Sequence, residues 1–349
     1  MLNGCYLRNG AEFYIAINNK GLWPNLTMLP GGEIGAVVYN QPSHGYGEGD
    51  VELWVSGDGG TLWELRSVVS DHSEDPELVR MNHAAGLNAN GDFVVLVSGH
   101  SAGRRPPTLP VQVCISSDGG ETWRRQVTDI PHIPFGDIVC KPDGTVVSAM
   151  YTSEAADVDC GPPGVVLLAS EDGGLTWNEW QRLPGNYNET ALLRCSNGRW
   201  LAAMRTLAPV RDDVLYYSGG PLQLTISEDE GRTWSSPLPV SLPCQHPAHL
   251  LELHDGRILL TYGSRIPGQH GVVVRLSDDY GESWSMPEPL ISVSAQTDCG
   301  YPSSVQLEDG LIVTAYYFGK QPHTPQDAPP TSVPWHHHYH MGVARWYAG

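Results

Sequence analysis

A short pattern of serine, aspartate, glycine and tryptophan occurs five times in the sequence and restricts the folds open to it. In each copy an Asp follows the Ser by two residues, a Gly by four and a Trp by seven. The copies span residues 56–63, 116–123, 170–177, 227–234 and 277–284. Each copy is typical of a hairpin turn, because the Asp side chain accepts hydrogen bonds from backbone amides and the Gly adopts a positive φ. The sequence therefore repeats one supersecondary unit, with the Trp expected to pack between neighbouring units.

A second repeat counts the units independently. Two short apolar strands, separated by a turn that ends in Gly, precede each copy of the pattern. The turn glycines recur at intervals of about 55 residues. They are Gly32, Gly91, Gly144, Gly198, Gly256 and Gly310. Six turns and five copies imply six units, and six four-stranded units in a ring form an all-β, six-bladed β-propeller.

Closing such a ring requires a strand from one end of the chain to complete a blade begun at the other end. Residues 13–17 and 341–345 are strand-like runs near the two ends, so we expect them to pair. Because the repeat uses almost the whole chain, we predict one domain over residues 1–349. The predicted blades cover residues 20–66, 80–127, 131–183, 186–240, 244–290 and 297–346, the last closed by residues 11–18.

Composition limits the partners. The 39 glycines, 28 prolines and 17% charged residues suit a turn-rich, all-β chain. A net charge of -19 argues against binding to nucleic acid or an anionic membrane, which needs a basic surface. The start lacks the features of a secretory signal, no apolar stretch is long enough to span a membrane, and the 7 cysteines lack metal-ligand spacing. We therefore expect a reduced, cytoplasmic protein without a cofactor.

The turn glycines define one face of the ring, and the first strand of each blade begins at the opposite face, around the axis. The aspartates of the repeated pattern return to the glycine face, so we expect them to be structural. Counting back nine residues from each turn glycine gives one equivalent rim position per blade. These positions are Trp23, Asn82, Phe135, Glu189, Pro247 and Tyr301. A carboxylate beside a phenol can activate it as a nucleophile, so Glu189 and Tyr301 are candidate catalytic residues. The alternative is that Tyr301 packs in the core and Glu189 caps a turn.

The repeated pattern resembles the Asp-box of the sialidase superfamily, and two further segments resemble the same family. Residues 188–205 are similar to the family segment that supplies an activating Glu and one arginine of a carboxylate-binding triad. Residues 300–310 are similar to the segment that holds the nucleophilic tyrosine, with the same spacing from the tyrosine to the turn. The resemblance implies that Tyr301 is the nucleophile, Glu189 its base and Arg205 a ligand of an acidic group. Sialidases with a tyrosine nucleophile are an exception among retaining glycosidases.

Blade 1 departs from that family. Sialidases open this blade with Arg-Ile-Pro, whereas this chain has Leu22, Trp23 and Pro24. Leu22 takes the place of the first triad arginine, and a leucine cannot make a charge-assisted, bidentate contact to a carboxylate. Arg80 at the start of the next blade and Arg265 after the second strand of blade 5 are the candidates to compensate. Either arginine can instead be a surface or loop-bracing residue.

The general acid is expected in the loop after the second strand of blade 1, residues 41–52, which is rich in glycine and carboxylates. Asp50 is the first candidate and Glu48 the second, the alternative being that each is a solvated loop carboxylate. The acid needs a raised pKa to donate a proton to the leaving oxygen. Further candidates for substrate contacts lie around the same rim: Asn25, Asn82, His44, His83, His132 and His246. No pair of these histidines has metal-ligand spacing on a single helix or strand, so we expect no metal.

The sequence thus predicts a carbohydrate-active enzyme, a retaining exo-glycosidase acting on a terminal and acidic sugar. Its runner-up is a polysaccharide lyase, or another glycoside hydrolase, in which rim His, Tyr and Arg side chains act on glycans that contain uronate or rhamnose. A third alternative is a propeller that binds glycans without turnover. The fold alone does not decide among these chemistries.

Overall fold

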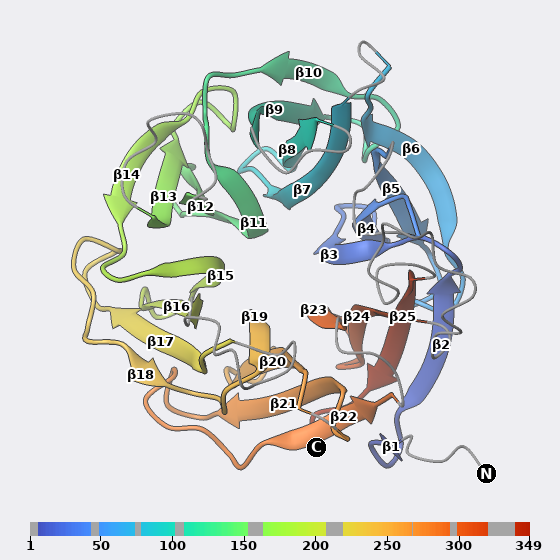
Figure 1. The fold of residues 1–349 in the computed structure, drawn as a ribbon, viewed down its shortest axis with the longest axis vertical. Helices are drawn as coiled ribbons and strands as arrows, with labels where there is room; N and C mark the ends of the chain where they lie inside the picture. Colours follow the sequence, from blue (N-terminus) through green and yellow to red (C-terminus); the bar gives the residue numbers. More distant parts are fainter. Residues whose placement is uncertain are drawn as a thin grey trace.

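The computed structural model describes residues 6–42, 49–73, 78–101, 108–152, 163–206, 219–266, 268–293, 299–319 and 339–349. Over these residues the chain is a ring of six blades, each built on a four-stranded antiparallel sheet, with the first strand of each blade nearest the axis (Figure 1). The prediction of an all-β, six-bladed propeller is confirmed. The described residues contain no helix long and apolar enough to cross a membrane.

The blades follow one another along the chain. Blade 1 contains β3 (Leu22–Met28), β4 (Ile34–Tyr39), β5 (Val51–Ser56) and β6 (Glu64–Ser70), and blade 2 contains β7 (Leu78–Leu87), β8 (Phe93–Ser101), β9 (Thr108–Ser116) and β10 (Arg124–Val127). Blade 3 contains β11 (Ile133–Cys140), β12 (Val146–Thr152), β13 (Gly164–Ser170) and β14 (Asn178–Arg182), and blade 4 contains β15 (Tyr187–Arg194), β16 (Trp200–Thr206), β17 (Leu222–Ser227) and β18 (Leu238–Pro239). Blade 5 contains β19 (Gln245–Glu252), β20 (Ile258–Ser264), β21 (Gly271–Ser277) and β22 (Glu288–Ser292). Blade 6 contains β23 (Gly300–Gln306), β24 (Ile312–Gly319), β25 (Tyr339–Trp346) and β2 (Glu12–Ile17).

The two ends of the chain close the ring as predicted. Strand β2 pairs antiparallel with β25, with Phe13 opposite Ala344 and Ile17 opposite Met341. A short strand before it, β1 (Tyr6–Leu7), adds a fifth strand to blade 5 by pairing with β22, which the sequence pattern did not indicate.

Blades 2 and 3 are joined more closely than the repeat predicts. Their first strands, β7 and β11, pair in parallel beside the axis, with Asp137 opposite Ala85. Gly86 permits this approach, because a Cβ at that position would lie 2.3 Å from the Ile138 carbonyl oxygen. The contact fixes where β11 projects its side chains toward the axis.

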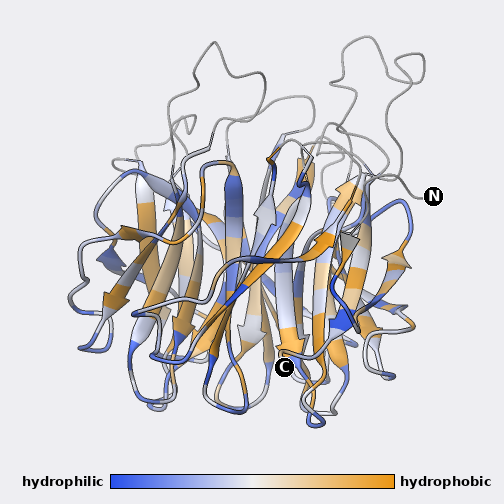
Figure 2. Cartoon of the chain, turned by 90° about the horizontal axis from the view of Figure 1, so that it is seen from below, coloured by the Kyte–Doolittle hydropathy of each residue, from blue (hydrophilic) through white to orange (hydrophobic). Residues whose placement is uncertain are grey.

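Apolar side chains fill the spaces between neighbouring blades. One such cluster joins blades 4 and 5 through Leu201, Leu224, Leu250 and Leu260, all at most 5% exposed. Figure 2 shows hydrophobic residues along the strands and hydrophilic residues in the turns at one end of the ring. Burial of these faces is the main stabilising contribution to the blades.

The repeated pattern forms the turns between third and fourth strands, as predicted. In blade 3, Ser170 Oγ donates to Asp172 Oδ1 at 2.7 Å, and the backbone N–H groups of Leu175 and Thr176 donate to the same carboxylate oxygen. The Trp177 indole N–H donates to the Gly174 carbonyl oxygen at 2.8 Å. The aspartate therefore holds its own turn together, as a structural residue would.

Candidate functional site

The first strand of every blade contains a β-bulge near the end at which it begins. The register shifts between Leu22 and Asn25, Arg80 and His83, Pro134 and Ile138, Tyr187 and Thr190, Gln245 and Ala248, and Gly300 and Ser303. All six predicted rim positions lie inside these bulges. A bulge redirects side chains relative to the regular strand alternation, so the same irregularity in each blade aims one residue at the axis.

Two of these rim residues have a left-handed backbone conformation. Tyr301 has a φ of 49° and Trp23 a φ of 52°. Bulky residues rarely adopt such angles, and the local strain is of the kind that accompanies functional positions.

Tyr301, Glu189 and Arg205 form one buried, hydrogen-bonded group. The Tyr301 hydroxyl donates to Glu189 Oε1 at 2.6 Å, which confirms the predicted contact between these residues. Arg205 Nη1 donates to the other oxygen, Glu189 Oε2, and lies 3.2 Å from the Tyr301 hydroxyl oxygen. Glu189 and Tyr301 are each only 8% exposed, so a carboxylate, a phenol and a guanidinium share a largely water-excluded corner of the rim.

Positive charge surrounds this group. The Arg265 guanidinium carbon lies 5.5 Å from the centre of the Tyr301 ring. Burial alone would lower the pKa of Arg205, but the charges of Glu189 and Tyr301 outweigh it, and the pKa of Arg205 is raised. Burial, followed by the charges of Arg205 and Arg265, lowers the pKa of His246, which keeps its ring neutral. Arg205, Arg265 and His246 therefore interact electrostatically with one another beside Tyr301 and Glu189, and their substrate-binding role stays a prediction.

A second phenol lies in the same neighbourhood. Burial, followed by electrostatic interaction with the Glu189 carboxylate and the Tyr301 phenol, holds the pKa of Tyr151 on β12 well above 10. Its hydroxyl therefore stays protonated. The sequence analysis did not identify Tyr151, because the rim count considered only first strands.

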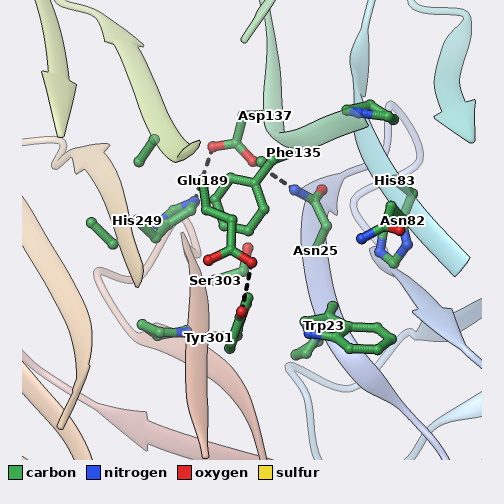
Figure 3. Close-up of a pocket in the computed structure, with 16 residues that line it drawn as sticks. Trp23, Asn25, Asn82, His83, Phe135, Asp137, Glu189, His249, Tyr301 and Ser303 are labelled. Atoms are coloured by element: carbon green, nitrogen blue, oxygen red, sulfur yellow. Dashed lines mark hydrogen bonds and ion pairs between the residues drawn. The ribbon is translucent and has the colours of Figure 1, made fainter. Parts of the chain in front are cut away.

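A cavity of about 40 Å³ lies on the axis beside Tyr301 and Glu189 (Figure 3). Asn25 and Asn82 line this cavity, as predicted, together with Trp23, Phe135 and Ser303. Such a volume holds one or a few water molecules.

A polar layer crosses the axis at this cavity. Asn25 Nδ2 donates to Asp137 Oδ1 at 2.9 Å, and His249 Nε2 lies 3.0 Å from Asp137 Oδ2 (Figure 3). The sequence analysis missed Asp137 and His249. Each lies two residues beyond the rim position of its blade, as Asn25 does in blade 1, so the two-residue period of a strand carries the signal that would have found them.

His83 lines the cavity but faces backbone. Its Nδ1 lies 2.9 Å from the Met81 carbonyl oxygen and its Nε2 3.1 Å from the Val37 carbonyl oxygen. Burial lowers the pKa of His83, and a neutral imidazole donates to one of these carbonyls at a time. The ring therefore braces blades 1 and 2, and its predicted contact with substrate stays a prediction. His132 is also buried, which lowers its pKa, and it is not among the residues lining the central cavity.

The predicted acid and one predicted arginine lie elsewhere among the described residues. Asp50 Oδ1 accepts hydrogen bonds from the backbone N–H of His72 at 2.9 Å and lies 2.6 Å from His72 Nδ1. Arg80 lines a separate hollow between blades 1 and 2, with Nη1 3.5 Å from the Pro110 carbonyl oxygen. Neither residue is among those that line the cavity beside Tyr301. The register shift between Arg80 and His83 interrupts the strand alternation, so the side-chain direction of Arg80 could not be predicted from its position in the strand. Asp50 lies away from the cavity because it bonds to His72 in the segment after β6. His44 and Glu48 lie outside the described residues.

Leu22 is packed where the resemblance places the first triad arginine. It is 0% exposed, in a cluster that includes Tyr39, Tyr317 and Tyr339, with Trp23 packed against it. The Tyr301 ring belongs to the same cluster. In this chain the side of the site next to Leu22 is therefore apolar and aromatic, whereas an arginine at position 22 would make it cationic. Across the described part of the chain, no three His, Cys, Asp or Glu side chains converge on a metal-sized point.

Comparison with known proteins places this geometry in context. The family model described as BNR repeat-like domain matches residues 38–314. A sialidase from Bacteroides fragilis is 24% identical over 313 residues, which cover 76% of this chain and 54% of that protein. The chain thus spans about half the length of this curated relative.

Solved structures with the same fold include proteins of known and unknown function. A Dyadobacter fermentans protein of unknown function superposes with a TM-score of 0.75 at 21% identity, covering 98% of this chain and 99% of that one. A Trypanosoma rangeli sialidase in complex with sialic acid superposes with a TM-score of 0.68 at 14% identity, covering 97% of this chain and 59% of that one. At these identities the likeness establishes the fold.

Proposed function

The chain belongs to the BNR repeat-like domain family, and from that premise we propose that it is a retaining exo-glycosidase of the sialidase type. Its substrate is a terminal, acidic sugar. The observation that carries the proposal is the 2.6 Å hydrogen bond from the Tyr301 hydroxyl to Glu189, with Arg205 bound to both side chains. The distant relationship to a Bacteroides fragilis sialidase supports the same reaction class.

The reaction follows from that geometry in two displacements. In the first, Glu189 accepts the phenolic proton as the Tyr301 oxygen attacks the anomeric carbon, and the glycosidic oxygen leaves with a proton from a carboxylic acid. In the second, the resulting carboxylate takes a proton from water, whose oxygen attacks the same carbon, and the departing tyrosine oxygen recovers its proton from Glu189. Two inversions give net retention. Arg205, 3.2 Å from the phenol oxygen, stabilises the negative charge that develops there.

We assign the acid to the segment 41–52, with Glu48 now ahead of Asp50. Asp50 accepts two hydrogen bonds within the segment after β6, and this holds its carboxylate beside His72. Replacing Glu48 with Gln should then reduce turnover of substrates with poor leaving groups much more than replacing Asp50 with Asn. Substrates whose leaving group needs no proton should be spared.

The charges favour an anionic sugar. A neutral phenol does not repel an anionic substrate as a carboxylate nucleophile would, and Arg205 and Arg265 supply positive charge on the adjoining side. The packed Leu22 removes the third cation of a full triad. The proposed substrate is therefore an acidic sugar recognised by fewer arginines than a common sialoside requires.

A screen against chromogenic glycosides and acidic oligosaccharides, with products resolved by mass, tests the proposal. The expected product is a free, saturated sugar, formed by the unmodified protein and abolished in the Tyr301→Phe variant, which lacks only the nucleophilic oxygen. An unsaturated uronate that absorbs in the near ultraviolet would identify elimination instead. Binding without turnover would identify a glycan-binding propeller.

A further inference from the structure

Blades 1 and 2 leave a hollow of about 300 Å³ between them, a volume at the lower end of the range of small-molecule sites. Its polar lining comprises Asp71, His72 and Ser73 after β6, Arg80 on β7, Gln112 on β9 and Arg125 on β10. Strand β6 ends and β7 begins here, so the hollow opens on the same face of the ring as the bulged strand ends that hold Tyr301.

The walls of the hollow are fixed by hydrogen bonds to the backbone and to neighbouring side chains. Arg125 Nε donates to the Val69 carbonyl oxygen at 2.8 Å, and its Nη2 donates to the Val68 carbonyl oxygen at 2.7 Å. Ser70 Oγ donates to Gln112 Oε1 at 2.7 Å, and this bond fixes the orientation of the Gln112 side-chain amide. A ligand would therefore meet side chains whose orientation is already set, which reduces the entropy lost on binding.

The acidic groups at the hollow also have defined partners. Asp50 holds the His72 ring through Nδ1 at 2.6 Å. Asp71 accepts from the backbone N–H of Ser73 at 3.0 Å, and that bond and the Ser73 hydroxyl lower its pKa. Asp71 is thus an oriented acceptor in the lining, with its Oδ2 4.0 Å from Arg125 Nη2, and Asp50 lies behind His72.

The balance of charge indicates the class of ligand. Two guanidiniums, Arg80 and Arg125, face one lining carboxylate, Asp71, with a second, Asp50, directly behind His72. An anion would require a net positive lining and a cation a net negative one, whereas this mixture offers donors and acceptors in near balance. Sugar hydroxyls both donate and accept, so they match such a lining.

We propose that this hollow binds one uncharged saccharide unit of a glycan, separately from the central cavity. The inference goes beyond the proposed glycosidase activity and does not depend on it. Because both sites open on one face, a glycan anchored between blades 1 and 2 can present another part of its chain to the rim.

Val127 offers a way to close the hollow without disturbing the core. It lines the hollow directly opposite Gln112, and its side chain is 55% exposed. Its neighbour Gln126 is opposite Val113 and so points to the other face of the sheet, and it is also exposed. Val127→Trp fills the hollow, and Gln126→Trp is the matched control.

The probes are the methyl glycosides of glucose, galactose, rhamnose and glucuronic acid, titrated by calorimetry and ligand-observed NMR.

At least one neutral glycoside should bind the unmodified protein and the Gln126→Trp variant with a Kd on the order of millimolar. Its affinity should fall about tenfold or more in Val127→Trp. Equal binding to all three proteins would place the ligand elsewhere and overturn the proposal, as would the absence of any binding by neutral glycosides. Preferential binding of the glucuronide that is lost in Val127→Trp would show an anion site instead. Because binding is measured and not turnover, an inactive central site would leave this result unchanged.

Discussion

For individual residues, the spacing from the turn glycines predicted some of the side chains at the rim and not others. Glu189 and Tyr301 were predictable because, in every blade, the position nine residues before the turn glycine lies inside the bulge of the first strand, so equal spacing selects equivalent positions. Arg80 was not, because the register shift between Arg80 and His83 interrupts alternation, and a slip of one residue reverses the face to which a side chain points. Asp137 and His249 each lie two residues beyond the rim position of their blade, so extending the count by one strand period would have found them; only their pairing across the axis depends on how the blades are arranged.

Arg205 is expected to act through the geometry of its guanidinium as well as its charge. The same nitrogen contacts both Glu189 and the Tyr301 oxygen, and a lysine ammonium cannot reproduce the planar fork. Arg205→Lys should lower kcat/KM by about 10²–10³. The matched control is Arg199→Lys, which alters an arginine of the same blade that pairs with Glu228 and Glu282. Near-normal activity of Arg205→Lys would contradict the role given to this side chain.

Leu22 should determine how the protein treats ordinary sialosides. Each charge-assisted hydrogen bond that a missing arginine would have made is worth about 1.5–3 kcal/mol. We therefore expect kcat/KM for a common sialoside to lie roughly tens to hundreds of times below that of a sialidase with a full arginine triad, and also below the value for this protein's preferred acidic sugar. Steady-state rates on both substrates measure the ratio. Efficient cleavage of the sialoside would contradict this role of Leu22 and would show that the protein has ordinary sialidase specificity.

At the element scale, the repeated turns were predictable in detail because each is a local structure. The Ser, Asp and Gly of each copy bond to one another within four residues, so their spacing specifies these hydrogen bonds. The Trp indole donates to the Gly carbonyl of its own copy in four copies, whereas Trp123 in blade 2 donates to Ser67 in blade 1. The parallel contact between β7 and β11 was not predictable, because it joins two separate blades and depends on Gly86 allowing close approach.

Asp172 tests the structural role of these turns. Asp172→Ala removes a carboxylate that accepts from Ser170, Leu175 and Thr176, and should lower the free energy of unfolding by about 1–3 kcal/mol. Turnover per folded molecule should stay nearly unchanged, because the turn lies at the face of the ring opposite the rim. Denaturant unfolding and active-site titration measure the two quantities. Loss of activity in a fully folded variant would show that this face had been assigned wrongly.

At the scale of the whole molecule, the repeat predicted the number of blades and their closure. Closure was predictable because the strand-like run near the start of the chain had no blade of its own, while the last predicted blade still needed a strand to complete it. The fifth strand of blade 5 was not, since β1 is two residues long and carries no pattern.

Closure by β2 should be essential to stability. Deleting residues 1–17 removes the strand that pairs with β25 and exposes a new sheet edge beside the first blade. We expect a lower Tm and concentration-dependent aggregation, measured by thermal unfolding and light scattering. Deleting residues 1–5 leaves both β1 and β2 intact and should avoid both effects. Equal stability of the two truncated proteins would argue against closure as a major stabilising contact.

The central claim is that Tyr301 forms a covalent bond with the sugar and so produces retention of configuration. Proton NMR of the anomer first released from the best substrate of the glycoside screen tests this most directly, provided that it is recorded before mutarotation. Double displacement through Tyr301, activated by Glu189 at 2.6 Å, predicts that the first product has the anomeric configuration of the substrate. Initial release of the opposite anomer would mean direct attack by water and would contradict the account.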